Sequence, residues 1–149
     1  MPLWLFFHPP GAFTDDESKR ALSEDVTKIY TSIGLPAFYV VVQFIELPRN
    51  KVWVGGKLPE KPFIRVVIEH IAVRLPDEDD AYKRTTAKVD ATLKPHIADK
   101  GYDWEYHIDE TDRRLWKING LAPPAWKSEA EQFWFQENKP LSWEGKYEG

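Results

Sequence analysis

LWLFF (residues 3–7) is an apolar run that ends at the turn-forming residues 9–11. A short apolar run with such a boundary predicts a buried β-strand. Thr14 and Glu17 then have the spacing of a capping box, in which each side chain satisfies a free amide at a helix start. The apolar residues that follow fall on one stripe of the predicted helix: Leu22, Val26, Ile29, Tyr30 and Ile33.

A second strand completes this first unit. Gly34 and Pro36 end the helix in the usual order. Residues 38–45 then form a continuous run of β-branched and aromatic side chains, which predicts a strand covered on both faces and parallel to the first. We therefore expect residues 2–46 to form one β-α-β unit.

The same pattern recurs in residues 63–109. Residues 63–71 predict a strand that places His70 on the same face as Val66 and Ile68. Pro76 and the acidic residues after it open a second helix, because negative charge suits the positive end of a helix dipole. The alternating aromatic and polar residues around Tyr106 predict a fourth strand.

The expected fold class is α+β, with one domain over residues 1–149. Two tandem β-α-β units should form a four-stranded sheet with two helices on one face. Val52–Val54 is expected to be a short edge strand between the units. The tail (residues 110–149) should add a short strand at residues 115–118 and a helix near residues 128–138. It carries four of the seven tryptophans, so it should cover the core or a neighbouring subunit.

Composition excludes several classes of function. Hydrophobic residues make up 42% of the chain and charged residues 30%, and the net charge of −4 with scattered basic residues argues against a nucleic-acid partner. The absence of cysteine excludes disulfides and thiol catalysis. The four histidines lack ligand spacing, so we expect no metal. Because no stretch reaches the roughly 18 apolar residues of a membrane span, a cytoplasmic protein without a membrane partner is expected.

Pro2 is the residue that points to chemistry. Cells generally remove an initiator methionine that precedes a small residue such as proline, which would leave a secondary amine at the start of a buried strand. A free α-amino group has a pKa near about 8, and apolar surroundings lower it by disfavouring the cation. A neutral amine at physiological pH is a competent general base or nucleophile. A strand that begins without any catalytic role is the plain alternative.

The combination of features resembles the tautomerase superfamily. These features are the leading Pro2, the duplicated β-α-β pattern, Gly55-Gly56 after a short strand, and Arg74 shortly after the third strand. Within the superfamily the chain is most similar to the cis-3-chloroacrylic acid dehalogenase-like branch, over roughly residues 2–125. The resemblance implies a homotrimer that needs no cofactor and has the N-terminal proline in its active site.

The resemblance also implies roles for particular residues. Pro2 and Tyr106 match catalytic positions, and Arg74 matches an arginine that binds the substrate carboxylate. Other positions depart from the branch: Ile71 replaces a second arginine, Tyr30 replaces a histidine, and Lys117, near Asn119, replaces the glutamate that activates water. Efficient hydrolytic dehalogenation is therefore not expected. We take the further substrate-binding candidates to be His70, Tyr30, Asn119 and Lys117.

Two classes of function remain open at this point. The first is a cofactor-independent tautomerase (an isomerase) in which Pro2 acts as general base on a small anionic organic acid, namely an enol or a 2-oxo or unsaturated carboxylic acid. Lyase, hydratase or dehalogenase chemistry on unsaturated acids belongs to the same kind of site. The second class is a non-catalytic ligand-binding or assembly protein of the ferredoxin-like dimeric-barrel type. In that class Pro2 would have no role. Separately, the plain alternative for Arg74 is a solvated or salt-bridged residue, and for Tyr106 it is core packing with a satisfied hydroxyl.

Overall fold

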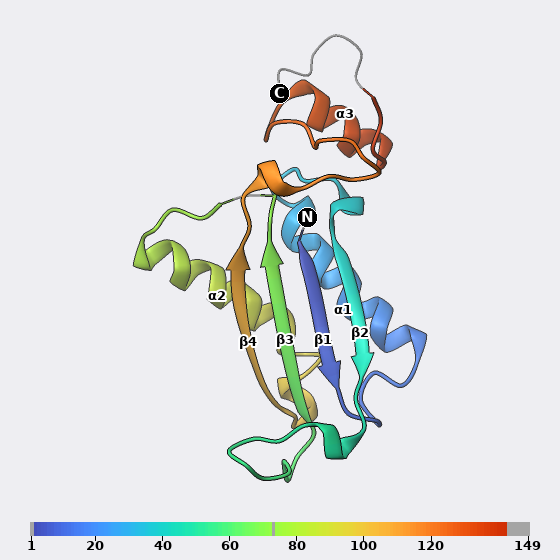
Figure 1. The fold of residues 1–149 in the computed structure, drawn as a ribbon, viewed down its shortest axis with the longest axis vertical. Coiled ribbons are helices and arrows are strands. Elements are labelled where there is room, and N and C mark those ends of the chain that lie inside the picture. Colours follow the sequence, from blue (N-terminus) through green and yellow to red (C-terminus); the bar gives the residue numbers. More distant parts are fainter. Residues whose placement is uncertain (1, 73, 143–149) are drawn as a thin grey trace.

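A four-stranded sheet forms the centre of the molecule. The computed structural model describes residues 2–72 and 74–142. The strands are β1 (Leu3–His8), β2 (Val41–Glu46), β3 (Phe63–His70) and β4 (Asp103–Glu110). They lie in the order β2-β1-β3-β4 (Figure 1). β1 is parallel to β2, β3 is parallel to β4, and β1 and β3 meet antiparallel, which confirms the predicted pair of β-α-β units.

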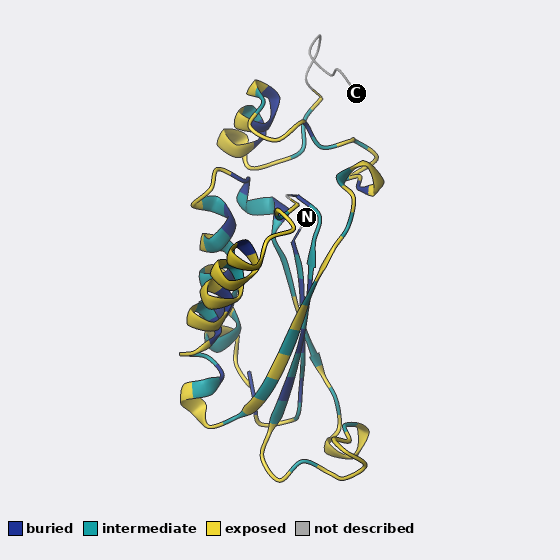
Figure 2. Cartoon of the chain, turned by 90° about the vertical axis from the view of Figure 1, so that its left-hand side faces the viewer, coloured by how far each residue is buried: buried dark blue, intermediate teal, exposed yellow. Residues whose placement is uncertain are grey.

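Two helices cover one face of this sheet, as predicted. α1 (Asp16–Thr31) and α2 (Asp79–Leu93) lie side by side on that face (Figure 2), and each connects two neighbouring parallel strands. In the split units of a ferredoxin-like domain another strand lies between the two that a helix connects. The observed strand order therefore argues against the ferredoxin-like alternative.

The core lies between the sheet and these helices. Alternate residues of β1 and β3 point towards α1 and α2 and are fully buried: Trp4, Phe6, Ile64, Val66 and Ile68. Leu22 and Val26 of α1 and Val89 and Leu93 of α2 pack against them. Each such side chain contributes about 1.5–3 kcal/mol on burial, so this alternation fixes which face of each strand meets the helices.

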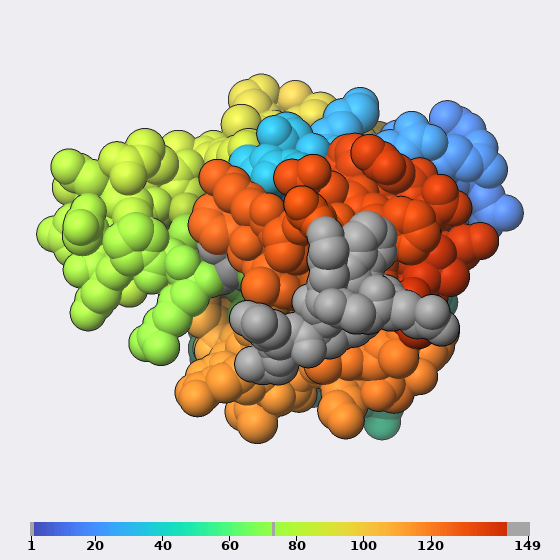
Figure 3. All heavy atoms as spheres, turned by 90° about the horizontal axis from the view of Figure 1, so that it is seen from above, coloured from blue at the N-terminus to red at the C-terminus, as the bar shows by residue number. Residues whose placement is uncertain are grey.

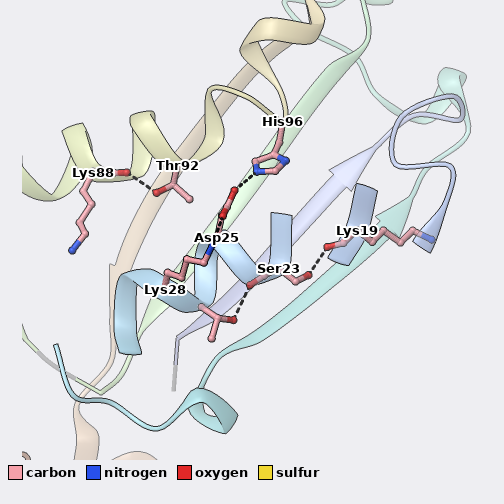
Figure 4. A network of polar contacts seen from close by, with 8 residues as sticks. Lys19, Ser23, Asp25, Lys28, Lys88, Thr92 and His96 are labelled. Carbon is pink, nitrogen blue, oxygen red and sulfur yellow. Dashed lines mark hydrogen bonds and ion pairs between the residues drawn. The ribbon is translucent and has the colours of Figure 1, made fainter. Parts of the chain in front are cut away.

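The helices also have a polar link, which Figure 4 shows. His96, in the turn after α2, lies with Nε2 2.7 Å from Oδ2 of Asp25 on α1. The hydrogen bond with His96 lowers the pKa of the Asp25 carboxyl below its usual value. Asp25 therefore stays ionised and holds the two helices together at this point.

The start of α1 differs from the prediction by one residue. Asp15, rather than Thr14, is the N-cap, and its Oδ1 accepts a hydrogen bond of 2.7 Å from the Ser18 amide. A carboxylate cap adds negative charge at the positive end of the helix dipole, which a threonine hydroxyl does not supply.

The second predicted strand is shorter and less covered than expected. β2 is an edge strand on which Gln43 and Glu46 are exposed, so it is not covered on both faces. The start of the apolar run forms a 3₁₀ turn instead, η1 (Ala37–Tyr39). Tyr39 is buried there, with its ring 4.7 Å from the ring of Trp116, because this stretch packs under the tail rather than in the sheet.

Two short predicted strands are also absent from the described residues. Residues 52–54 contribute only an isolated bridge between Val54 and Lys57, and residues 115–118 only one between Ile118 and Leu121. The remaining short helical turns are η2 (Arg49–Lys51), η3 (Ala98–Lys100) and η4 (Arg113–Leu115). The predicted tail helix is present as α3 (Glu129–Glu137), with Ser128 as its N-cap and Asn138 as its C-cap.

The tail lies over the end of the sheet where β1 begins and β3 ends (Figures 1 and 3). Trp116 and Trp134 are buried, whereas Trp126 is exposed and Trp143 lies outside the described residues. Two of the tail tryptophans thus cover the molecule's own core.

A buried ion pair attaches this tail. Nη2 of Arg113 lies 2.5 Å from Oε2 of Glu131, whose side chain is only 2% exposed. Arg113 also donates to the carbonyls of Ala72, at 2.7 Å, and of Pro124. The Lys127 amide donates to the other Glu131 oxygen at 2.9 Å. These bonds tie the tail to the end of β3.

No helix among the described residues is long and apolar enough to cross a membrane.

Glu131→Ala should lower the free energy of unfolding by about 3 kcal/mol, because it leaves a largely buried guanidinium without its charge partner. Urea denaturation followed by tryptophan fluorescence measures the change. Glu137→Ala, at an exposed position of the same helix, is the matched control and should change stability by less than about 0.5 kcal/mol. Equal stability of the two variants would contradict the structural role of the pair.

Candidate active site

A cavity of about 150 Å³ opens at the end of the sheet where β1 begins, between α1 and α2. Its polar side chains come from Tyr30, His70, Thr85 and Lys88, and the rest of its wall, which includes Pro2, is apolar. A cavity of about this volume holds a molecule of the size of benzene. The site therefore suits a small organic molecule.

Strand register places Pro2 beside His70. Pro2 is buried, and its carbonyl accepts a hydrogen bond of 3.0 Å from the Val41 amide. The antiparallel register pairs Leu3 with Glu69, and continuing it by one residue sets Pro2 opposite His70. Both residues fall on the helix-facing side of their strands, since side chains alternate along a strand. The two groups thus share one wall of the cavity.

Tyr30 connects His70 to the core. Nε1 of Trp4 donates to the Tyr30 hydroxyl over 2.9 Å, and this hydroxyl lies 2.6 Å from Nε2 of His70. Burial raises the pKa of Tyr30 above its ordinary value and lowers the pKa of His70 to about 4. Both side chains are therefore neutral at physiological pH.

The structure brings three of the sequence-predicted site residues together and separates the others. Pro2, Tyr30 and His70 line the cavity. Arg74 is exposed in the loop after β3, beside the lining residue Leu75, and is not itself part of the wall. Its position leaves it at the rim of the site.

Tyr106 faces α2 instead. Its hydroxyl donates to Oδ1 of Asp90 at 2.7 Å and lies 3.2 Å from the Thr86 carbonyl. Burial, and then the bond to Asp90, raises the pKa of Tyr106. It lines a neighbouring cavity of about 400 Å³ that shares Leu75 and Thr85 with the first. Within this single chain Tyr106 and Pro2 therefore occupy different cavities.

Lys117 and Asn119 belong to the tail. Both are exposed, and Asn119 has a φ of 49° in the turn between Ile118 and Leu121. Neither lines the cavity that holds Pro2.

Sequence reasoning missed the contribution of α2. Thr85, Lys88 and Val89 line the cavity with the spacing of one helix face. Lys88 is exposed, and its ammonium has no ion-pair partner within residues 2–72 and 74–142, so it is available to an anion. The spacing places these three residues on one helix face, but only the packed structure shows that this face borders the cavity.

The described residues hold no group of three or more His, Asp or Glu side chains placed to bind a metal ion. Another cavity, of about 250 Å³, lies at the opposite end of the sheet and is lined by Pro9, Pro10, Pro62 and Phe63, among others. Lys61 also lines this cavity, but its prolines are internal to the chain and therefore carry no free secondary amine.

Comparisons with known proteins identify the class to which this fold and site belong. The family model described as "Putative oxalocrotonate tautomerase enzyme" matches residues 1–139, so the chain belongs to that family. None of the curated proteins compared with the chain matches it.

Solved structures agree with this assignment. Native RhCC from Rhodococcus jostii RHA1 is 41% identical, with 95% of this chain and 99% of that chain covered and a TM-score of 0.88. A probable enzyme from the thermophilic fungus Aspergillus fumigatus is 42% identical, with 96% and 98% covered and a TM-score of 0.86. Native fused 4-OT is 25% identical, with 80% and 94% covered and a TM-score of 0.58.

The buried, neutral His70 makes stability depend on pH. In the unfolded chain a histidine has a pKa near about 6.5, against about 4 for His70 in the native protein. Between these values only the unfolded chain takes up the proton, so the free energy of unfolding falls as the pH is lowered from about 6.5 to 4. Urea denaturation at pH 7 and pH 4.5 should show a loss that is about 2–3 kcal/mol smaller in His70→Gln. Gln43→Ala, at an exposed position without an ionisable side chain, is the control and should keep the full loss. An identical loss in His70→Gln would contradict a neutral His70.

Proposed function

We propose that the protein is a cofactor-independent tautomerase, an isomerase in which Pro2 acts as general base on a small enol or 2-oxo carboxylic acid. The observation that carries the proposal is the position of Pro2 at the wall of a small, mostly apolar cavity, opposite a neutral His70. Membership of an oxalocrotonate tautomerase-like family supports it. So does a solved neighbour, Pt0534, which is described as inactivated by 2-oxo-3-pentynoate and shares this fold at 18% identity.

The reaction moves one proton. With Met1 removed, the neutral nitrogen of Pro2 takes the proton from the enol hydroxyl and leaves the O–H electron pair on an enolate oxygen. As an electron pair of that oxygen forms the C=O bond, the electrons of the C=C bond take the proton from the Pro2 ammonium at the neighbouring carbon. The O–H bond breaks, a C–H bond forms, and the amine is regenerated. No cofactor or co-reactant is consumed, and the apolar wall keeps the amine uncharged between turnovers.

Cations at the rim would hold the substrate carboxylate. Arg74 lies in the loop next to Leu75, and Lys88 lies on the cavity wall. A guanidinium can bind a carboxylate through two parallel hydrogen bonds, whereas an ammonium acts as a compact point charge. We therefore assign Arg74 and Lys88 jointly to carboxylate binding. Tyr106, Lys117 and Asn119 keep their proposed roles only through a site that a neighbouring subunit helps to form.

Hydration or dehalogenation of unsaturated acids is the second candidate, through the similarity to the cis-3-chloroacrylic acid dehalogenase-like branch. Lys117 disfavours it, since a lysine stands where that branch has its water-activating glutamate. Proton transfer by Pro2 does not require that glutamate.

Removal of Met1 should switch the activity on, because the nitrogen of Pro2 is an amide without basicity until then. Phenylenolpyruvate ketonisation is measured for protein whose intact mass shows a free Pro2 and for a form extended at its N-terminus. We expect turnover only in the first form, rising with pH through one deprotonation below about 8. Pro2→Ala retains a primary amine and should keep partial activity. Equal rates for the processed and extended forms would disprove the proline mechanism.

Loss of either rim cation should weaken substrate binding. Arg74→Ala and Lys88→Met should each raise KM for phenylenolpyruvate roughly 10- to 100-fold, as expected when a charge-assisted hydrogen bond is lost, with little change in Tm. Lys83→Met, on an exposed position of α2 outside the cavity, is the control. If one of the two variants binds substrate like the control, that cation is a surface residue only.

We further propose that the protein is a homotrimer. Leu5, Phe7 and Val67 lie on the sheet face opposite the helices and are only partly buried, so this face offers apolar area to another subunit. A fused 4-OT that shares this fold at 23% identity is described as an asymmetric trimer. Sedimentation equilibrium should give about three times the chain mass of 17.4 kDa. A monomer would refute the trimer.

A further inference from the structure

Three side chains form a hydrogen-bonded series from the core to the cavity wall: Trp4, Tyr30 and His70. They come from three different elements (β1, α1 and β3), and Trp4 is fully buried. The ring of His70 stands at 87° to that of Tyr30 with 5.6 Å between centroids, an edge-on contact that fixes the orientation of the imidazole.

The direction of the protons in this series follows from the chemistry of its members. The indole nitrogen of Trp4 can only donate, so the Tyr30 oxygen accepts from it. The Tyr30 hydroxyl has one proton, and its remaining neighbour within hydrogen-bond distance among the described residues is Nε2 of His70. Tyr30 therefore donates to Nε2, which must be unprotonated. A neutral imidazole with a bare Nε2 carries its proton on Nδ1.

The Nδ1–H group remains available at the cavity. No residue in the described part of the chain forms a hydrogen bond with it. Solvent nevertheless reaches this atom, unlike Arg113 Nε and Trp116 Nε1, which are buried without a partner. His70 lines the cavity opposite Pro2. A donor of fixed orientation thus belongs to a residue that shares the cavity wall with Pro2.

We propose that His70 is a catalytic hydrogen-bond donor whose Nδ1–H binds the substrate oxygen that becomes negative when Pro2 removes the enol proton. Trp4 and Tyr30 are positioning residues that hold His70 in this tautomer. The inference rests on the proposed function. His70 keeps its proton throughout, so the step remains a transfer of one proton from oxygen to Pro2 and from Pro2 to carbon.

A neutral donor suits this reaction for an electrostatic reason. A permanent cation at position 70 would repel the Pro2 ammonium that forms during the reaction. The neutral imidazole instead offers a preoriented dipole to the oxyanion in an apolar setting, where such donors are most effective. The low pKa of His70 keeps it in this form over the working pH range.

Kinetics and NMR on the protein with a free Pro2 test the proposal together. His70→Ala should lower kcat for phenylenolpyruvate about 100-fold, as for the loss of one oxyanion donor. His70→Gln, which keeps a neutral N–H donor, should recover part of it. Tyr30→Phe should lower kcat roughly tenfold through loss of a positioning bond. His96→Gln, outside the cavity, should match the wild type. Covalent labelling of Pro2 by 3-bromopropiolate should be retained in all four variants.

Histidine ¹⁵N spectra provide the readout that a merely structural role would not change. They should show His70 as the single Nδ1–H tautomer at pH 7 in the wild type, and a mixture of tautomers in Tyr30→Phe. Wild-type kcat in both His70→Ala and Tyr30→Phe, or an Nε2–H tautomer, would overturn the proposal while turnover by Pro2 stands. If the processed wild type neither turns over the enol nor is labelled at Pro2, the proposed function fails, and the catalytic role of His70 fails with it.

Discussion

The antiparallel pairing of β1 with β3 is the constraint on which the rest of the structure depends. It joins the two β-α-β units into one sheet and brings both helices to the same face. The register that pairs Leu3 with Glu69 also sets Pro2 opposite His70, although 68 positions of sequence separate them. A slip of one residue would turn every buried side chain of β1 away from the helices, so the core and the site are fixed by the same pairing.

The distribution of charge around the site follows from this arrangement. The groups inside the cavity wall, Tyr30 and His70, are uncharged because burial disfavours their ionised forms. Charged side chains that could meet an anion, Arg74 and Lys88, lie at exposed positions. The buried charges of the tail, Arg113 and Glu131, neutralise each other. A small acid would therefore meet cations first and a neutral, apolar interior afterwards.

Much of this could be predicted from the sequence, and the failures have identifiable causes. Alternation and helical periodicity located β1, α1, β3 and β4, because these elements bury one regular face. Periodicity could not distinguish a central strand from an edge strand, so β2 was expected to be covered on both faces. The N-cap was misplaced because Thr14 and Asp15 are both good caps, and their backbone geometry decided between them.

The site was predictable only in part. Pro2, Tyr30 and His70 were found from strand faces and a family resemblance, and they lie together. Tyr106 was not separable from them by sequence, because only the packing of β4 against α2 directs its hydroxyl to Asp90. Lys88 was missed because an exposed lysine on a helix has no distinctive pattern. Its relevance depends on which helix face borders the cavity, and that is a property of the packed structure.

The meeting of β1 and β3 has a consequence for symmetry. Two like units that pair antiparallel with their helices on one face are related by an approximate twofold axis perpendicular to the sheet, so the sheet has two similar ends. One end holds Pro2, and the other holds the cavity at Pro62 and Phe63, where the second unit begins. A duplicated chain has only one amino terminus. The nitrogen of Pro62 is a tertiary amide, so the pseudo-equivalent end has no counterpart of a free proline amine, although the side chain of Lys61 lines the cavity there.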